Sequence, residues 1–527
     1  TESFSSGNTI ESFFKHVEKH YGRYYFHNLK FDGQFLLYYL LTNGYRHVTS
    51  REVPVNSFST LISDMGQFYT ITVRFEDTES GIKRVVEFAD SLKIIPMPVK
   101  AMPKAFGLDI YKLEIDYDEE REEGHELTQR ERDYLKNDVL IVARSLQKMH
   151  DMGMTKLTVG SNALNNFMGD YTKTEKKYLF PKISLSEDRD IRLAYKGGFT
   201  YLNPKYKELK LNEGQVYDVN SMYPWAMKYC LLPYGDGSFY EGEYVKDEIF
   251  PLYVQCLKCE FELKENMIPT IQIKNSMFYN ETEYLKKSER PEILHLTSVD
   301  LQLFKEHYNI YNVEYICGYK YRGRKGMFSE YIDRWYKVKT ESKESGNMSM
   351  YTIAKLMLNS LYGKFGTNPK KRSKYPWYDK DNDIVRYSLQ AEEIGKGGYI
   401  PIAAFITAYA RDKIIRAAQA CGDNFVYADT DSIHIIGNET PDIDIDDYRL
   451  GAFKLESNFT TAKFLRQKCY IETINGELNK KCAGMPDIVK ENLDYDTLEK
   501  GHSFTGKLVP KIVKGGVVLK NTDFTIK

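Results

Sequence analysis

The sequence lacks a long hydrophobic run and an excess of either charge. Its 73 Lys and Arg residues balance 74 Asp and Glu residues, for a formal net charge of -1, which argues against a protein that coats nucleic acid non-specifically. No apolar stretch reaches the roughly 20 residues needed to span a membrane, and no signal peptide is present, so we expect no membrane partner. The chain begins with Thr rather than Met, which suggests a trimmed start.

The cysteines have no disulfide-framework spacing. There are seven of them, scattered along the chain, which favours a reducing compartment such as the cytoplasm, of the host cell if the protein is viral. Cys256 and Cys259 form a lone CxxC, but no second ligand pair accompanies it, so we interpret both as strand residues rather than zinc ligands.

No internal repeat and no Pro/Gly/Ser linker divides the 527 residues, although a chain of this length needs several domains. Aromatic residues make up 14%, which is compatible with core packing or with stacking on bases. The first 150 residues alternate strand-like and helical patterns, so we predict an α/β unit there. The later segments that we expect to be regular are a strand-like run at 215–227, a helical hairpin at 328–343 and 350–365 around Gly346, and a helix at 400–420.

Two carboxylates stand close together in the stretch VYADTDSIHIIG, residues 426–437, which has the pattern of a buried hairpin. Alternation along a strand would put Asp429 and Asp431 on one side and Thr430 on the other. Burying two like charges without a counter-ion costs roughly several kcal/mol. A divalent cation would supply the missing counter-charge and so make burial of both carboxylates acceptable. An exposed Asx-type turn is an equally good interpretation of DTD taken alone.

A third carboxylate favours the metal interpretation. Asp218 ends another apolar run, and the Ser, Tyr and Pro that follow it should make the chain turn. One Asp from each of two strands, together with triphosphate oxygens, can hold paired Mg²⁺ ions for in-line phosphoryl transfer.

The helical segment MYTIAKLMLNSLYGKF provides a complementary positive charge. Lys355, Asn359 and Tyr362 fall within an arc of about 60° when successive residues are about 100° apart. The lysine could contact β/γ-phosphates as a point charge, and the tyrosine could stack on a base, although a solvated face explains the first two residues equally well. The residues expected on the opposite, packed side are Ile353, Leu356, Met357 and Leu361.

These motifs resemble those of family B DNA polymerases, in particular the protein-primed subgroup, over almost the entire chain. DVNSMYP, KLMLNSLYG and YADTDS resemble the three polymerase motifs in order, and FLRQKCY resembles the KxY motif. AYKGGFT resembles the YxGG motif between the exonuclease and polymerase regions. HNLKFDG and ERDYLKNDVLIV resemble the second and third motifs of the 3′–5′ exonuclease domain.

The resemblance implies roles for individual residues of the polymerase site. Asp218 and Asp431 would be the main metal ligands, with Asp429 supporting them. Lys355 would contact the phosphates of the incoming nucleotide, and Lys468 would hold the primer terminus. Two Mg²⁺ ions are implied at this site, with Mn²⁺ as a possible substitute.

Further residues would bind the substrates. Tyr223 would lie under the nucleotide sugar and exclude a 2′-hydroxyl, and Tyr470 would help to hold the nascent base pair. The residues by themselves indicate only the carboxylates and the lysine, because tyrosines are common packing residues in a chain with 42 of them. The remaining residues implied in this group are Val219, Asn359, Tyr362, Tyr195, Gly197 and Gly198.

The exonuclease motifs imply a second metal-dependent site. Tyr134 and Asp138 stand at i and i+4 on one helix face, which suits one metal ligand and one hydroxyl that orients water. Asp32 would be another ligand, and Lys112 corresponds to a catalytic lysine of the family. The residues that resemble single-strand-binding residues are His27, Asn28, Phe31 and Phe35, although the two phenylalanines would serve equally well in a core.

The chain departs from the family at its start. The exonuclease domain of the family opens with a DxE motif upstream of HNLKFDG, and this chain begins between the two. Only about half of the expected carboxylates are present, so we expect hydrolysis to be lost or crippled in the chain as given.

We therefore predict an α/β (α+β multidomain) protein with palm, fingers and thumb and an N-terminal RNase H-like exonuclease domain. Its partners would be primer-template DNA, dNTPs and a priming terminal protein, and it would be a monomer or a heterodimer with that protein. The implied divisions are exonuclease 1–158, palm 159–229 and 399–482, terminal-protein-region insertions 230–330 and 367–398, fingers 331–366 and thumb 483–527.

The predicted function is template-directed dNTP addition in viral DNA replication, with strand displacement. One alternative is another two-metal enzyme, a reverse transcriptase or nuclease, against which the KxxxNSxYG helix argues. A second alternative is a non-catalytic nucleic-acid-binding protein, against which the intact Asp218 and Asp431 argue. Apart from the resemblance, the polar segment 367–398 would be a solvated loop.

Overall fold

The fold is seen in a computed structural model of the 527-residue chain. The structure describes residues 3–50, 52–115, 125–273, 277–280 and 282–527. Among the helices of these residues, none is both long enough and apolar enough to cross a membrane.

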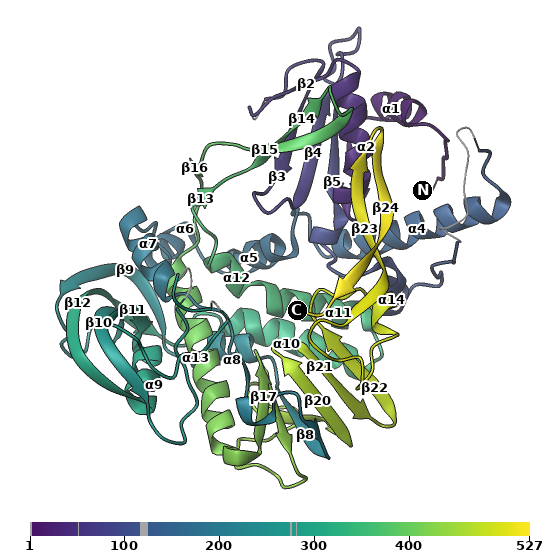
Figure 1. The fold of residues 1–527 in the computed structure, drawn as a ribbon. Helices are drawn as coiled ribbons and strands as arrows, with labels where there is room; N and C mark the ends of the chain where they lie inside the picture. Colours follow the sequence, from purple (N-terminus) through teal and green to yellow (C-terminus); the bar gives the residue numbers. More distant parts are fainter. Residues whose placement is uncertain (1–2, 51, 116–124, 274–276, 281) are drawn as a thin grey trace.

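A five-stranded sheet forms the core of the N-terminal body, at the top of Figure 1. Its strand order is β1-β5-β4-β3-β2; β1 pairs with β5 and β2 with β3 in parallel, and the other pairs are antiparallel. Helix α4 begins at a capping box in which Thr128 and Glu131 satisfy each other's backbone N–H groups. The strands are β1 Arg23–Phe26, β2 Arg46–His47, β3 Ser57–Ile62, β4 Phe68–Arg74 and β5 Val85–Asp90; the helices are α1 Ile10–Lys19, α2 Leu29–Thr42, α3 Met102–Phe106 and α4 Gln129–Asp151.

A second five-stranded sheet has the order β19-β8-β18-β17-β6. Its strands β8 and β17 lead into the motifs DVNSMYP and YADTDS. All of its pairings are antiparallel. Helix α13, buried along nearly its whole length, packs against this sheet through Ala410 and Ile414. The elements are β6 Thr200–Leu202, β8 Gly214–Val219, α8 Met222–Tyr229, α13 Ile400–Ala420, β17 Phe425–Asp429, β18 Ser432–Ile436 and β19 Phe453–Phe459.

A four-stranded antiparallel sheet, of order β22-β21-β20-β7, packs beside the central sheet, and the chain ends in a long hairpin. This hairpin, β23–β24, extends towards α2, where Gly516 lies against the ring of Phe35 (Figure 1). The elements are β7 Lys210–Leu211, β20 Thr461–Arg466, β21 Cys469–Ile474, β22 Glu477–Cys482, α14 Asp487–Lys490, β23 Ser503–Val513 and β24 Gly516–Thr525.

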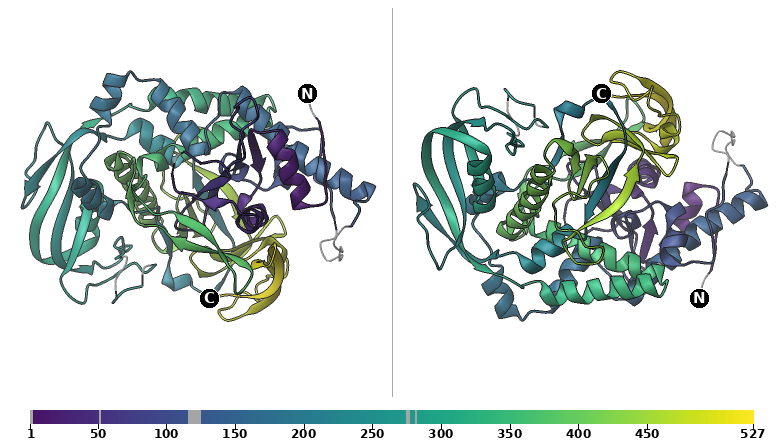
Figure 2. Two further views of the ribbon diagram at one scale, coloured as in Figure 1. Left: turned by 90° about the horizontal axis from the view of Figure 1, so that it is seen from above. Right: turned by 90° about the horizontal axis from the view of Figure 1, so that it is seen from below.

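The segment from 232 to 324 forms a separate sheet at one end of the molecule, as the two views of Figure 2 show. Cys256 and Cys259 are both buried in β10, as expected of strand residues. The elements here are β9 Leu232–Glu241, β10 Leu252–Leu263, β11 Glu292–Thr297, α9 Ser298–His307 and β12 Tyr308–Arg324. The helices before the central sheet are α5 Val159–Gly169, α6 Lys173–Leu179 and α7 Leu185–Ala194.

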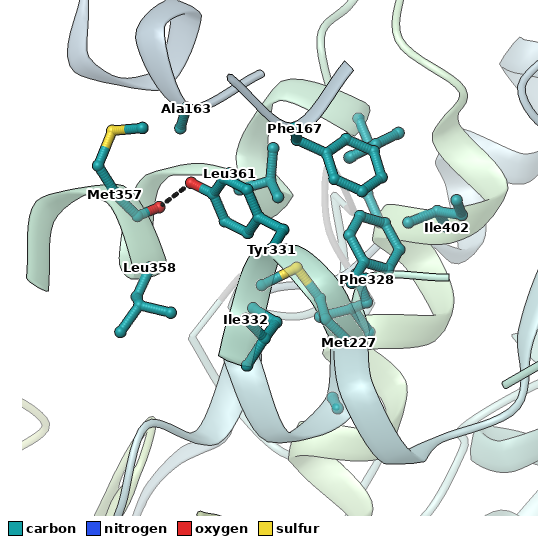
Figure 3. Close-up of a cluster of buried hydrophobic side chains, with 14 of the residues drawn as sticks. Ala163, Phe167, Met227, Phe328, Tyr331, Ile332, Met357, Leu358, Leu361 and Ile402 are labelled. Atoms are coloured by element: carbon teal, nitrogen blue, oxygen red, sulfur yellow. Dashed lines mark hydrogen bonds between the residues drawn. The ribbon is translucent and has the colours of Figure 1, made fainter. Parts of the chain in front are cut away.

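A helical hairpin carries the lysine motif. Helices α10 (Ser329–Glu344) and α11 (Met348–Ser360) turn at Gly346, whose φ of 71° suits a residue without a Cβ. The Tyr331 hydroxyl donates to the Met357 carbonyl at 2.8 Å across a cluster of buried apolar side chains (Figure 3). Because this face of α11 is buried, its opposite face is left free to point outwards.

Two sequence interpretations are corrected by the structure. The strand at 215 ends at Val219, and the following residues 222–229 form helix α8, because Ser221 adopts a left-handed conformation and Pro224 is tolerated in a first helical turn. The segment 367–398 is not a solvated loop. It forms two small ribbons, β13 Lys370–Lys371 with β16 Glu393–Ile394 and β14 Lys374–Asp379 with β15 Ile384–Leu389.

Candidate active site

The tight turn between β17 and β18 lies beside the end of β8. Asp429 pairs with Ser432, so Thr430 and Asp431 form the turn itself, and Thr430 has a left-handed φ of 65°. Ser432 in turn pairs with Asp218, and the Val219 N–H donates to the Asp431 carbonyl at 2.8 Å. Thus Asp431 follows a bend rather than the simple strand alternation that the sequence suggested, and the turn brings its backbone against β8.

The YxGG segment supports this turn. The Thr430 N–H donates to the Phe199 carbonyl at 2.8 Å, and a Cβ on Gly198 would lie 2.8 Å from Thr430 Cγ2. Arg411 of α13, nearly fully buried, donates to the Gly197 carbonyl at 2.9 Å and forms a bidentate pair with Asp300. The sequence analysis missed Arg411, which carries little signal because it is one of several charged residues in the second half of a largely apolar helix.

The two carboxylates of the site repel each other. Burial, Asp431 and Glu456 together raise the pKa of Asp218 to about 7, against partial relief from Lys454 and Lys355. Burial, with Asp429 and Glu456 nearby, also raises the pKa of Asp431. A pair of half-buried carboxylates that disfavour their own charge is a donor set suited to a hard divalent cation.

Asp429 has a different environment. Its carboxylate lies 3.2 Å from the Lys468 ammonium and accepts a hydrogen bond from the Tyr427 hydroxyl at 3.2 Å. Thr200 contributes a longer hydrogen bond at 3.4 Å. Because its own chain already supplies these partners, Asp429 is a weaker candidate for a direct metal ligand than Asp431.

Helix α11 presents its polar residues as the sequence predicts. Lys355 and Asn359 are exposed, whereas Ile353, Met357 and Leu361 are buried, with Leu356 in between. Tyr362 follows in α12 (Tyr362–Phe365) and stacks on Tyr223, with ring centroids 4.1 Å apart.

A second lysine of the helical hairpin was missed by the sequence analysis. The Lys339 ammonium donates to Ser221 Oγ at 3.0 Å, directly after β8. Burial, together with the neighbouring cation Lys355, lowers its pKa, while Asp218 opposes the shift. Only its position about three turns into the first helix of the pair could have indicated it.

The remaining residues of the predicted nucleotide pocket are mostly internal. Tyr195 packs closely against Gly366, since a Cβ added to this glycine would lie 2.9 Å from the tyrosine hydroxyl. Val219 is buried. Tyr470 is also buried and stacks on Phe464, with ring centroids 5.0 Å apart.

The exonuclease motifs place three of their residues together. The Lys112 ammonium lies 3.0 Å from the Tyr134 hydroxyl and 2.5 Å from Asp138 Oδ2. Asp138 Oδ1 is buried and, within the described part of the chain, has no hydrogen-bond partner. This orphaned oxygen fits a metal ligand.

Asp32 lies on α2, and no contact joins it to this group in the part of the chain that the structure describes. Burial, with Asp90 nearby, raises its pKa to about 6. Across the described ranges, no three or more His, Cys, Asp or Glu side chains are clustered so as to hold a metal ion. Among the described residues, each site therefore presents carboxylates in ones and twos.

The predicted single-strand-binding residues surround the start of α2. Asn28 is exposed, has a left-handed φ of 78°, and its N–H donates to Asp90 Oδ1 at 3.0 Å. Phe31 and Phe35 are half-buried with centroids 6.1 Å apart. The His27 ring is held between Ser91 Oγ at 3.0 Å and the Met97 carbonyl at 2.9 Å, so its ring nitrogens are already engaged.

The comparison with known proteins identifies the family and the class of this fold. A family model described as DNA polymerase type B, organellar and viral, matches residues 15–124 and 113–450, and the chain belongs to this family. The fold is accordingly that of a family B polymerase, with mixed α and β content.

Individual relatives are phage polymerases. The DNA polymerases of Bacillus phage Nf and Bacillus phage phi29 are each 44% identical over 548 residues, covering 100% and 99% of this chain and 94% of each relative. That of Streptococcus phage Cp-1 is 34% identical over 95% of this chain and 87% of the relative. The solved structure of phi29 DNA polymerase complexed with primer-template DNA and incoming nucleotide matches with a TM-score of 0.93, covering 99% of this chain and 94% of that one. The chain is therefore a viral DNA-directed DNA polymerase of the phi29 type.

Proposed function

We propose that this polymerase extends a DNA primer with dNTPs by two-metal phosphoryl transfer at Asp218 and Asp431. The observation that carries the proposal is the meeting of these two carboxylates at the end of β8 and the β17–β18 turn, with raised pKa values at both. The relatives' structures with primer-template DNA and nucleotide support the substrates. Members of this family use divalent metal ions, and the all-oxygen donor set favours Mg²⁺, with Mn²⁺ as a substitute.

When bound, the cations would lower the pKa of the primer 3′-hydroxyl and neutralise the leaving pyrophosphate. The carboxylates of Asp218 and Asp431 would hold them, together with oxygens of the triphosphate. Lys355, exposed on α11, contacts the β/γ-phosphates as a point charge. Lys339, held at Ser221, adds positive charge near Asp218.

The stacked pair of Tyr223 and Tyr362 forms the wall of the nucleotide pocket in this proposal. Their parallel rings leave a flat surface beneath a sugar and base, and the first of them would collide with a 2′-hydroxyl. Asn359, one turn before Tyr362, completes the exposed stripe. Lys468, whose ammonium lies beside Asp429, holds the primer terminus.

The test is primer extension in Mg²⁺ by the full chain and by Asp431→Asn, a change of almost identical size. We expect the substitution to lower the extension rate by at least about 10³-fold, since the ligand charge is lost while the fold is kept. Extension at the wild-type rate would contradict the site. Running the same assay on DNA and RNA templates separates a DNA-templated enzyme from a reverse transcriptase.

We also propose a weak 3′–5′ exonuclease at Asp138, Tyr134 and Lys112. Support comes from the buried oxygen of Asp138 that has no hydrogen-bond partner among the described residues, and the weakness from the absence, across the same residues, of a cluster of three or more His, Cys, Asp or Glu side chains. Slow, Mg²⁺-dependent release of nucleotides from single-stranded DNA that is abolished by Asp138→Ala is expected. Rapid degradation would show that further ligands are present.

The wider assignments follow the same relatives. Partners besides DNA and dNTPs would be a priming terminal protein, with the polymerase a monomer or a heterodimer with it in the host cytoplasm, engaged in viral replication with strand displacement. In domain terms we propose exonuclease 1–158, palm 159–229 and 399–482, insertions 230–330 and 367–398, fingers 331–366 and thumb 483–527, since each boundary falls at or near an element end.

A further inference from the structure

A buried, hydrogen-bonded pair of polar side chains crosses the apolar interface between the central sheet and the β20–β22 sheet. His434 of β18 and Glu472 of β21 have side chains only 3% and 1% exposed, and the imidazole Nδ1 donates to Glu472 Oε1 at 2.6 Å. The side chains that surround this interface are otherwise apolar or aromatic: Leu202, Tyr206, Leu211, Val216, Val426, Tyr427, Phe459, Ala462, Phe464 and Tyr470.

A carboxylate in such surroundings is stable only where its oxygens are satisfied. His434 takes one oxygen of Glu472, and Asn479 Nδ2 of β22 donates to the other at 3.2 Å. The carboxylate therefore ties the strand β21 to β18 on one side and to β22 on the other. Displacing β21 by one residue relative to β18 would leave these polar side chains buried without partners, so the pair specifies how the two sheets are placed against each other.

The register matters because of what lies at the beginning of β21. Lys468 immediately precedes this strand, in a turn where it adopts a left-handed φ of 57°. Its backbone N–H donates to the Tyr427 hydroxyl at 2.9 Å, and that hydroxyl in turn donates to Asp429 at 3.2 Å. The Lys468 side chain is 55% exposed, and its ammonium lies 3.2 Å from the other carboxylate oxygen of Asp429.

The pair and this turn share an aromatic neighbourhood. The His434 ring lies 5.3 Å from the rings of both Tyr427 and Tyr470, centroid to centroid. Tyr427 stands on the strand next to His434 and is its paired neighbour. A shift of the imidazole would therefore move the tyrosine whose hydroxyl holds the Lys468 backbone.

We infer that His434 and Glu472 are positioning residues that set the place of Lys468, and through it of the primer terminus, without touching substrate. The inference rests on the primer-binding role proposed above for Lys468. It predicts that damage to the pair is expressed through Lys468, whereas a merely structural role would weaken the whole enzyme independently of that lysine.

The experiment is a double-mutant cycle in the full chain. Glu472→Leu removes both acceptor oxygens, Glu472→Gln keeps an acceptor for His434, and Asn479→Ala is a milder change at the half-buried end. Each is made alone and with Lys468→Ala, and the Kd for primer-template and the KM for dNTP are measured separately. Leu211→Ala, in the same interface but on β7, is the matched control for lost packing.

We expect Glu472→Leu to raise the Kd for primer-template about ten-fold, since a buried donor loses its partner, with the KM for dNTP unchanged. Glu472→Gln should restore most of the affinity, Asn479→Ala should have a smaller effect in the same direction, and Leu211→Ala should have none. In the Lys468→Ala background the Glu472→Leu effect should fall below about two-fold.

Full multiplicative effects in the double variant would overturn the inference, as would equal losses from Glu472→Leu and Leu211→Ala. If Glu472→Leu does not fold, the cycle with Asn479→Ala decides alone, and a normal Kd there would count against the pair. If Lys468→Ala by itself leaves the Kd for primer-template unchanged, the proposed role of the lysine is wrong, which is a separate failure.

Discussion

Replacing Asp218 by Asn should stabilise the metal-free protein while abolishing polymerisation. Burial and the charges of Asp431 and Glu456 raise the pKa of this carboxyl from its usual 3.8 to about 7. That difference corresponds to at most about 4 kcal/mol of unfavourable free energy when the native carboxylate is ionised. Because the side chain is half-buried and its surroundings can relax, we expect a measured gain of about 1–3 kcal/mol for Asp218→Asn at pH 8.

The sign follows from proton binding. Between pH 4 and pH 7 native Asp218 holds a proton that the unfolded chain has released, so this group stabilises the wild type at low pH and the contribution is lost as pH rises. The advantage of Asp218→Asn should therefore be largest above pH 7 and vanish near pH 4. Urea unfolding in EDTA at several pH values measures it directly.

Asp429→Asn is the matched control. This carboxylate already has a lysine and a tyrosine as partners, so its removal should not stabilise the protein. Adding Mg²⁺ should reverse the order, because the wild type gains stability from binding and Asp218→Asn gains little. Equal stability of Asp218→Asn and wild type at pH 8 in EDTA would refute the electrostatic description of the site.

Three further outcomes test the pocket and its support. Lys355→Ala should raise the KM for dNTP about ten- to a hundred-fold, the cost of a lost charged hydrogen bond, and leave the Kd for primer-template unchanged; a change confined to DNA binding in a filter assay would refute the phosphate role. Tyr223→Val should lower discrimination against ribonucleotides by about ten-fold or more in single-nucleotide extension, with Tyr223→Phe as the control that keeps the ring. Gly198→Ala places a Cβ 2.8 Å from Thr430 Cγ2, so it should destabilise the protein by about 1–3 kcal/mol and slow extension, and normal melting and extension would show that the turn can move.

Local patterns were enough for much of the framework. The helix at 400–420, the helical hairpin around Gly346 and the exposed stripe of Lys355 and Asn359 all follow from periodicity. Such features depend on residues three or four positions apart, so they can be predicted from the local sequence. The segment 222–229 shows the limit of such patterns. Its aromatic residues predict a continued strand, but the left-handed Ser221 ends the extended chain and helix α8 follows.

The motif sequence also selected the candidate residues of the proposed site, since Asp218, Asp431 and Lys355 each stand in a recognisable pattern. It could not select their supports. Arg411, Lys339 and the pair of His434 and Glu472 carry no motif, and each reaches its partner from an element more than thirty residues away in the chain.

The sequence by itself thus determined which side chains could bind metal and nucleotide, because that chemistry resides in residue type. Only the tertiary structure decided which of the neighbouring carboxylates is free for a cation. Asp429 and Asp431 are nearly identical in sequence context, yet Lys468, Tyr427 and a left-handed Thr430 give them different partners. Of these residues, Lys468 comes from the turn before β21 in another sheet, and such a long-range neighbour is set by packing across sheets rather than by the order of residues along one strand.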